Sequence, residues 1–174
     1  MRSRLAALIV GTLALGGAGA AAAAAPQPVA PAKNAVGTVN IAFPSSIRKL
    51  YDMDFGAVTV TAAGTAVLNS STDAVTTTGG VIFAGGAPHA AEFEAVSPSK
   101  NVVRITLPKT ASTLTRVGGT QTMTVDTWTI NGTATRNVTA HETFAFRVGG
   151  TLRVGANQVE GVYVGTFDVT INYN

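Results

Sequence analysis

The last fourteen residues of the chain alternate between apolar and polar positions in the pattern of a β-strand. Side chains on a strand point alternately to its two faces, so every second residue lies on the same face. We therefore predict one closing strand from Gly161 to Tyr173, with one large apolar face and one mostly polar face. Chain ends usually fray, so a closing strand this apolar must be tied into other structure. The apolar face consists of Tyr163, Phe167, Val169, Ile171 and Tyr173.

Short segments with the same alternation occur along most of the chain. They are separated by turn-forming Gly, Pro, Asn and Asp, and no window after Ala25 carries a helical period. Many short strands with turns about every eight to twelve residues predict an all-β fold, a single antiparallel β-sandwich of the immunoglobulin-like or pilin-like kind. The segments are residues 38–43, 53–60, 66–68, 75–86, 91–95, 103–107, 120–130 and 144–154.

Two of these segments contain an irregularity. Paired glycines at 79–80 and 85–86 surround an apolar triplet, which predicts a bulged strand or a hairpin. Within residues 120–130 the alternation changes phase, because Val125 lies on one face and Trp128 on the other. A change of phase inside a strand is what a β-bulge produces. Residues 144–154, by contrast, keep one phase through a further pair of glycines.

The N-terminus has the features of a secretory signal peptide. Two arginines precede an apolar run from Leu5 to Leu15, and an alanine-rich stretch follows to Ala25. The apolar run is too short for a stable membrane span, so cleavage within residues 20–25 is favoured over an uncleaved anchor. We predict a signal peptide at 1–25, a Pro/Ala-rich linker or extension at 26–36, a sandwich domain at 37–174 and no transmembrane segment in the mature chain. The protein is then exported, to the periplasm, the cell surface or a fimbrium.

Composition limits the possible partners and chemistry. Without Arg2 and Arg4, ten basic residues remain against nine acidic ones, and no long basic run survives to bind nucleic acid. The chain has no cysteine, which excludes disulfides, thiolate metal sites and a cysteine nucleophile. The core alone must therefore hold the fold of an exported domain.

Side chains that could carry chemistry do not form a recognisable site. His89 and Glu92 could be half of a metal site, but a surface histidine beside an exposed glutamate explains them better. Asp52 and Asp54 share a strand face and could bind a cation or act as an acid/base pair, although a solvated face is the simpler interpretation. The other histidine, His141, has no partner at a metal-binding spacing. We predict no enzyme activity, no metal and no cofactor.

The closing strand resembles the C-terminal strand of chaperone–usher pilus subunits. Those subunits have a glycine fourteenth from the C-terminus and an aromatic residue before the last one, and this chain has Gly161 and Tyr173 there. In that family the strand pairs with a periplasmic chaperone and later lies beside a donor strand lent by the next subunit. The resemblance implies a strand-pairing surface made of Gly161, Tyr163, Phe167, Val169, Ile171 and Tyr173.

A broader resemblance covers most of the mature chain. Several motifs are similar to the bacterial domain-of-unknown-function 4402 family, whose members are exported, single-domain and β-rich. The family implies a fold but no activity. The motifs are residues 52–56, 76–80, 122–126, 152–157 and 165–173.

These observations lead to two functional hypotheses. The first is a subunit of a fimbria-like or other surface assembly of a Gram-negative bacterium, with a periplasmic chaperone and sister subunits as partners. Residues 35–43 could then serve as a donor strand, although they fit the domain's own first strand better. The alternative is a self-sufficient secreted sandwich that binds a ligand such as surface glycan, through aromatics that include Trp128, Tyr163 and Tyr173.

Overall fold

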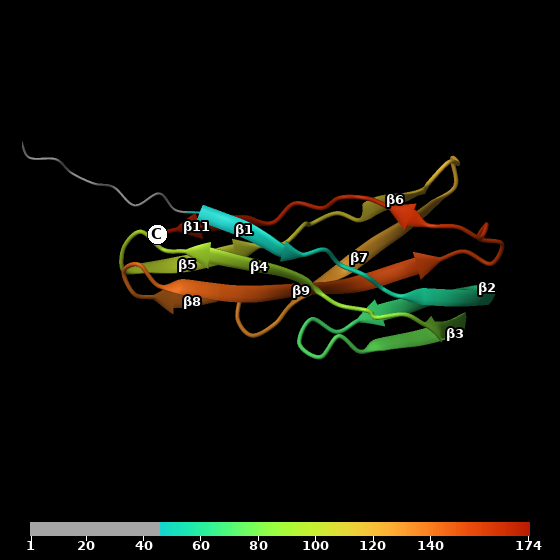
Figure 1. The fold of residues 1–174 in the computed structure, drawn as a ribbon, viewed down its shortest axis with the longest axis horizontal. Coiled ribbons are helices and arrows are strands. Elements are labelled where there is room, and N and C mark those ends of the chain that lie inside the picture. The colour runs from blue at the N-terminus through green and yellow to red at the C-terminus, as the bar shows by residue number, and fades with distance from the viewer. Residues whose placement is uncertain (1–45) are drawn as a thin grey trace, which may run out of the picture. The chain divides into compact units, whose positions relative to one another are not determined.

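The computed structural model describes residues 46–174, which form antiparallel β-sheets in a sandwich-like arrangement (Figure 1). The signal peptide, the linker and the strand predicted at 38–43 lie outside the described residues. The described residues include no helix that could span a lipid bilayer. The strands are β1 (Ser46–Tyr51), β2 (Ala57–Leu68), β3 (Val75–Gly85), β4 (Ala91–Val96), β5 (Asn101–Thr106), β6 (Ser112–Arg116), β7 (Thr122–Ile130), β8 (Thr135–Val138), β9 (Thr143–Val154), β10 (Tyr163–Val164) and β11 (Thr170–Tyr173).

Strand β9 is the centre of the larger sheet, which has eight strands. One edge of β9 pairs with β4 over residues 143–148 and then with β2 over residues 150–154. The other edge pairs with β7. The resulting order is β1-β4-β9-β7-β6-β10, and β3 pairs with β2 outside this path. A single strand therefore holds together both halves of this sheet.

The smaller sheet has the order β11-β5-β8 and supplies the second layer. Val103 of β5 and Val138 of β8 pack with Phe146 and Val148 of β9 in one buried cluster. A second cluster lies where β2, β3, β7 and β9 meet, and consists of Phe55, Ala66, Leu68, Val81, Val125, Leu152 and Val154. Each fully buried large apolar side chain contributes roughly 1.5–3 kcal/mol, so these two clusters stabilise the fold without covalent cross-links.

Both predicted irregularities are confirmed. The pairing of β7 with β9 shifts register between Asp126 and Thr129, and Thr127 has a φ of 49°. The glycine pair in β3 lies opposite a register shift between Val60 and Gly64. There the extra residues belong to β2, which runs from Ala57 to Leu68. The two strands predicted at 53–60 and 66–68 are therefore one strand that begins later than predicted. In β2 the local glycine therefore marks a bulge and not a strand end.

Arg147 of β9 ties the larger sheet to the turn between β2 and β3. Its guanidinium donates to the carboxylate of Asp73 and to the carbonyl of Ser71. The Asp73 carboxylate also accepts from the backbone N–H of Ala90 at 2.7 Å. The hydrogen bond from Arg147 holds the pKa of Asp73 below its ordinary value.

Replacing Asp73 with asparagine tests this link. Asparagine can keep the bond to Ala90 and tolerates the positive φ of 62° at this position, so only the charge is removed. We expect the free energy of unfolding at neutral pH to fall by roughly 1–2 kcal/mol. Because the folded-state pKa is lowered, the stabilisation is complete above the unfolded pKa of about 4 and is lost as the pH falls through the folded value.

Urea titrations of both chains between pH 7 and pH 2 measure this difference. The matched control is Asp52→Asn, because Asp52 forms an ion pair with Lys49 that is exposed at the surface. That variant should unfold like the wild type at every pH. A gap between Asp73→Asn and wild type that persists at pH 2 would show that the ion pair is not its cause.

Candidate functional site

The predicted closing strand is two short strands in two different sheets. Strand β10 pairs with β6 in the larger sheet, whereas β11 pairs with β5 in the smaller one. Residues 165–169 cross between the sheets without regular pairing. The prediction of one continuous strand is therefore wrong, because the chain changes sheet while its alternation continues. We refer to residues 161–174 as the tail.

The alternation within the tail still matches its surroundings. Tyr163, Phe167, Val169, Ile171 and Tyr173 are half-buried, whereas the residues between them are exposed. Four of the five pack against the cluster that contains Phe146. The tail thus points these five side chains inward, as the pattern predicted, but none of them is fully covered, and Val162 and Val164 are exposed.

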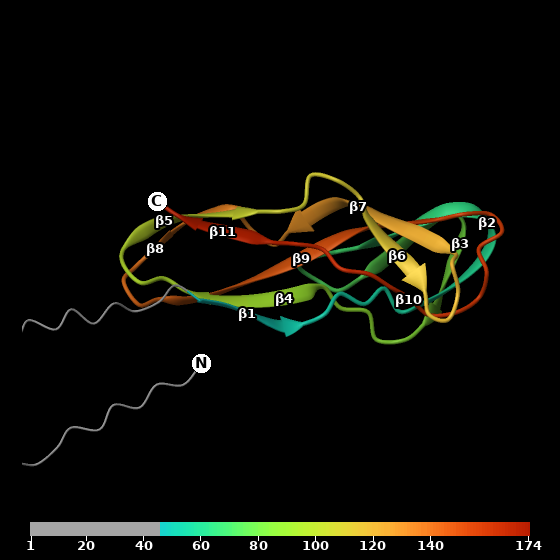
Figure 2. The same cartoon turned by 90° about the horizontal axis from the view of Figure 1, so that it is seen from above.

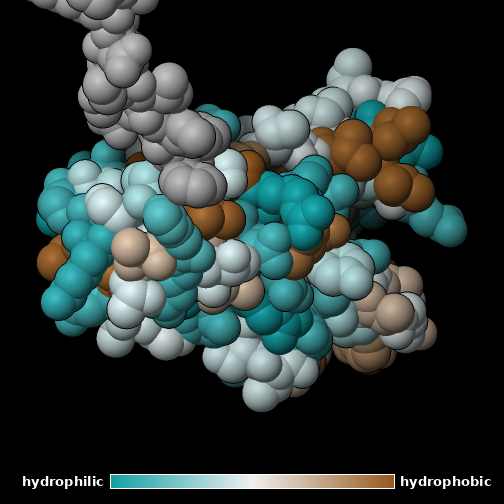
Figure 3. Space-filling model, turned by 60° about the vertical axis from the view of Figure 1, so that its left-hand side comes forward, coloured by the Kyte–Doolittle hydropathy of each residue, from teal (hydrophilic) through white to brown (hydrophobic). Residues whose placement is uncertain are grey.

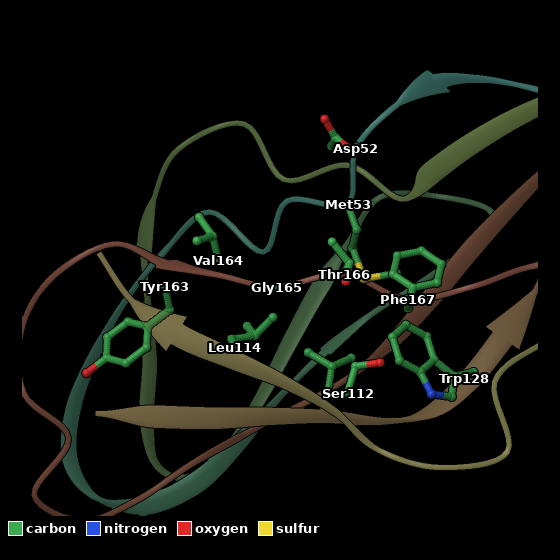
Figure 4. Close-up of a pocket in the computed structure, with 11 residues that line it drawn as sticks. Asp52, Met53, Ser112, Leu114, Trp128, Tyr163, Val164, Gly165, Thr166 and Phe167 are labelled. Carbon is green, nitrogen blue, oxygen red and sulfur yellow. The ribbon is translucent and has the colours of Figure 1, made fainter. Parts of the chain in front are cut away.

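Phe167 is the central contact of the tail. Its ring packs against Trp128 of β7, with ring centroids 4.6 Å apart, and edge-on to Phe93 of β4 at 6.4 Å. The side chain of Met53 reaches towards the same ring, as Figure 4 shows. Aromatic contacts of this kind add about 0.5–1.5 kcal/mol per pair beyond the area they bury. Phe167 therefore anchors the part of the tail that has no strand partner.

An apolar groove runs beside the tail. A cavity of about 370 Å³ lies between the tail and the segment after β1, and Met53, Trp128 and Phe167 line it (Figure 4). A second, more open cavity of about 910 Å³ extends along residues 53–60. Leu114 and Tyr163 line both cavities. The two cavities share Met53, Leu114 and Tyr163 in their linings, so they lie next to each other on this side of the domain, and we refer to them together as the groove.

Two glycines allow the tail to follow β6 closely. A Cβ atom at Gly165 would lie 2.4 Å from the carbonyl oxygen of Thr113, which is too close for any side chain. Gly161 has a φ of 148°, and a Cβ there would lie 2.6 Å from Nε of Arg116. That same Nε donates to the carbonyl of Glu160 at 2.7 Å. The glycine at 161 is therefore explained by the entry of the chain into β10.

The two tyrosines of the tail are held by hydrogen bonds. The hydroxyl of Tyr163 donates to the carbonyl of Val159 at 2.5 Å and accepts from the Gln158 amide. The hydroxyl of Tyr173 donates to the carbonyl of Val96, at the end of β4, at 3.2 Å. Burial raises the pKa of Tyr173 above its ordinary value, so this hydroxyl stays protonated. Both ends of the tail are thus fixed to the domain.

Strand β11 has one unpaired edge among the described residues. Asn174 and Val102 exchange both backbone hydrogen bonds, at 3.0 and 3.1 Å. Such pairs alternate in an antiparallel ladder, so Asn172 also faces β5, whereas Ile171 and Tyr173 point their N–H and C=O groups away from it. No described strand pairs with that second edge. Ile171 and Tyr173 therefore offer a template for one more strand.

Strand β1 borders the same open side. Ile47 pairs with the buried Ala95 and shares its inward face, yet Ile47 is 46% exposed. Arg48 marks the outward face, where it forms an ion pair with Glu94. Figure 1 places β1 and β11 along one margin, and Figure 2 shows them in separate layers with β9 visible between them. Figure 3 shows one face of the molecule, on which several hydrophobic side chains reach the surface.

Of the residues considered for catalysis or metal binding, the structure brings Asp54 and His89 side by side, but they do not belong to a larger group of potential ligands. The Asp54 carboxylate accepts from the backbone N–H of Gly56, whereas that of Asp52 pairs with Lys49. His89 forms an isolated backbone bridge with Asp54. Residues 46–174 contain no group of three or more His, Asp or Glu side chains placed to hold a metal ion.

The three aromatics proposed as a ligand platform have separate environments. Trp128 packs against Phe167, and its indole N–H donates to the carbonyl of Thr110 at 3.2 Å. Tyr163 lines the groove beside it, but Tyr173 lies at the far end of the tail and bonds to β4. Trp128 thus serves the core in addition to lining the groove.

Sequence comparison matches residues 46–173 to the family described as Domain of unknown function (DUF4402). The chain belongs to the DUF4402 family. The match covers nearly all the described residues and begins at the first residue of β1. Searches of curated proteins and of solved structures give no match. For this DUF4402 chain, function must therefore be argued from the groove and the tail.

Two contributors to the groove were not predicted from the sequence. Met53 was assigned only to a strand, and no strand was predicted at residues 112–116, where β6 places Leu114 in the groove. Residues 46–51, which form β1 beside the open side, were not predicted to form a strand either. The sequence pattern of β1 is weak, because each of its two faces carries one charged residue, Arg48 or Lys49, so that neither face is continuously apolar. Met53 packs against both buried clusters. The sequence around it could not indicate this, because the contact depends on the fold of the distant tail.

Proposed function

We propose that this DUF4402 protein is a subunit of an exported surface assembly, such as a fimbria, and that its tail accepts a strand from another chain. The acceptor is the outward edge of β11 together with the groove beside Phe167. The donating chain is a periplasmic chaperone during export or a sister subunit in the assembly. Gly161, Tyr163, Phe167, Val169, Ile171 and Tyr173 form the pairing surface.

The single observation that carries this proposal is the half-paired state of β11. Its inner edge bonds to β5, whereas the N–H and C=O groups of Ile171 and Tyr173 face no described strand. An added strand would satisfy these groups and cover the half-buried apolar side chains of the tail. Main-chain bonds give such a complex its affinity, and pockets for alternate side chains give it specificity.

Amide hydrogen exchange, measured residue by residue by NMR, tests the proposal directly. In the isolated chain we expect the amide of Ile171 to exchange at least about tenfold faster than that of Asn172, because only Asn172 is bonded to β5. On assembly, or with the cognate chaperone, the Ile171 and Tyr173 amides should become as protected as their neighbours.

The intervening residues of the same strand are the internal control. Protection of Asn172 reports on the fold, whereas protection of Ile171 reports on the partner. Equal protection of both amides in a dilute, strictly monomeric chain would mean that the edge is already covered, and would end the proposal. Unchanged exchange at Ile171 in the assembled state would also contradict it.

A further inference from the structure

Strand β3 is a long edge strand without the usual protection. It pairs with β2 on one side, and no described strand pairs with its other side. Over its 11 residues β3 contains no charged residue and no proline. Across the whole hairpin, residues 57–86, the only charged side chain is Asp73, which is bound by Arg147. Such an edge readily pairs with another strand.

Two other edge strands among the described residues carry charge. Strand β1 carries Arg48 and Lys49 on its two faces, and β8 carries Arg136. Charged side chains on an edge are a common means of preventing one sheet from joining another. Strand β3 lacks this protection, as do the much shorter edge strands β10 and β11.

The C-terminal half of β3 also exposes apolar side chains. Ile82 is 56% exposed on the outward face, and Phe83 is 37% exposed. Val81, between them and the bulge, is buried in the cluster with Leu152. The half-strand at residues 81–84 therefore combines a firm attachment to the core with an open backbone edge and exposed apolar surface.

We propose that β3 pairs with β3 of a second copy of this chain, antiparallel and about a two-fold axis through Ile82. A two-fold interface brings the same surface of both copies together, so a charged residue near the axis would face the same charge on the other copy. Strand β3 has no charged residue and avoids this repulsion. Ile82 then lies opposite Ile82 of the other copy. This surface is separate from the tail, so it goes beyond the strand pairing proposed above and links subunits sideways.

The test compares the mass of the full mature chain with that of variants by sedimentation at increasing concentration. Ile82→Lys places like charges across the axis and should raise the dimer dissociation constant at least about tenfold. Ile82→Glu should do the same. A mixture of the two variants should associate again, because opposite charges then face each other.

The matched control is Val67→Lys. Val67 is 37% exposed on the outward face of β2, but its strand is paired on both sides by β3 and β9. The same charge there should leave association unchanged, and thermal unfolding should show that all three variants are folded. A wild-type chain that stays monomeric to about 1 mM overturns the proposal.

Two further results would also overturn it. The first is equal loss of association in Val67→Lys and Ile82→Lys. The second is association that survives in Ile82→Lys while the amide of Ile171 becomes protected. That second outcome would leave the strand pairing at the tail intact, so the two proposals fail separately.

Discussion

Replacing Gly149 with alanine is expected to lower the free energy of unfolding by about 3 kcal/mol or more, at the upper end of the cost of overpacking. A Cβ at this position would lie 2.3 Å from the carbonyl oxygen of Leu68 and 2.9 Å from both the Ser70 nitrogen and the Thr129 hydroxyl. Two of these atoms are backbone and cannot turn away. The clash falls where β9 exchanges β4 for β2, so relief would require the two halves of the sheet to separate. Chemical denaturation monitored by the fluorescence of Trp128 measures the loss.

Gly155, six residues further along the chain, provides the control. At Gly155 a Cβ would meet only the Gln158 side chain, at 3.6 Å, which is ordinary contact. We expect Gly155→Ala to change stability by no more than about 0.5 kcal/mol. If both variants lost the same free energy of unfolding, the close approach of β2 to Gly149 would not be the cause. Alanine would then be unfavourable at both positions for a general reason.

Replacing Phe167 with alanine should have the second large effect. Complete removal of a buried phenylalanine costs about 3–5 kcal/mol, and we expect about 2–3 kcal/mol here because the ring is half-buried. The loss removes the contacts with Trp128 and Phe93 that hold the crossing segment of the tail. Partner strands should bind more weakly as well, since the groove loses one wall.

Asp168→Ala is the matched control, because Asp168 is exposed and follows Phe167 directly. Its stability and its partner binding should equal those of the wild type within about 0.5 kcal/mol. Denaturation curves give the first quantity and calorimetric titration with the isolated partner gives the second. A Phe167→Ala chain as stable as the Asp168→Ala chain would show that the tail is not packed as described.

Local patterns predicted the class of the fold and several details of its strands. The change of phase around Thr127 predicted a bulge that the structure confirms. The unbroken phase of residues 144–154 predicted one strand through two glycines, and that strand is β9. These predictions were correct because each depends on residues that are neighbours in the sequence, and side-chain alternation depends only on the local backbone.

Features that depend on distant segments were not predictable in the same way. The tail alternates identically in β10 and in β11, so its sequence contains no sign that it changes sheet. The contact between Trp128 and Phe167 joins residues far apart in the chain, and neither residue type specifies the other. The inward side chains of the candidate site were therefore predicted, whereas the groove beside them was not.

The position of β9 in the chain also has a consequence for the order of folding. Strands β2, β4 and β7 all pair with β9, yet β9 begins only at residue 143. During synthesis, four pairs can form before it, β1 with β4, β2 with β3, β5 with β8 and β6 with β7, but no strand yet joins them into the larger sheet. High average sequence separation between partners slows folding into the millisecond-to-second range. A nascent chain of this protein thus spends most of its elongation as strand pairs that β9 has not yet joined, a period in which proteases and holding factors have access to it.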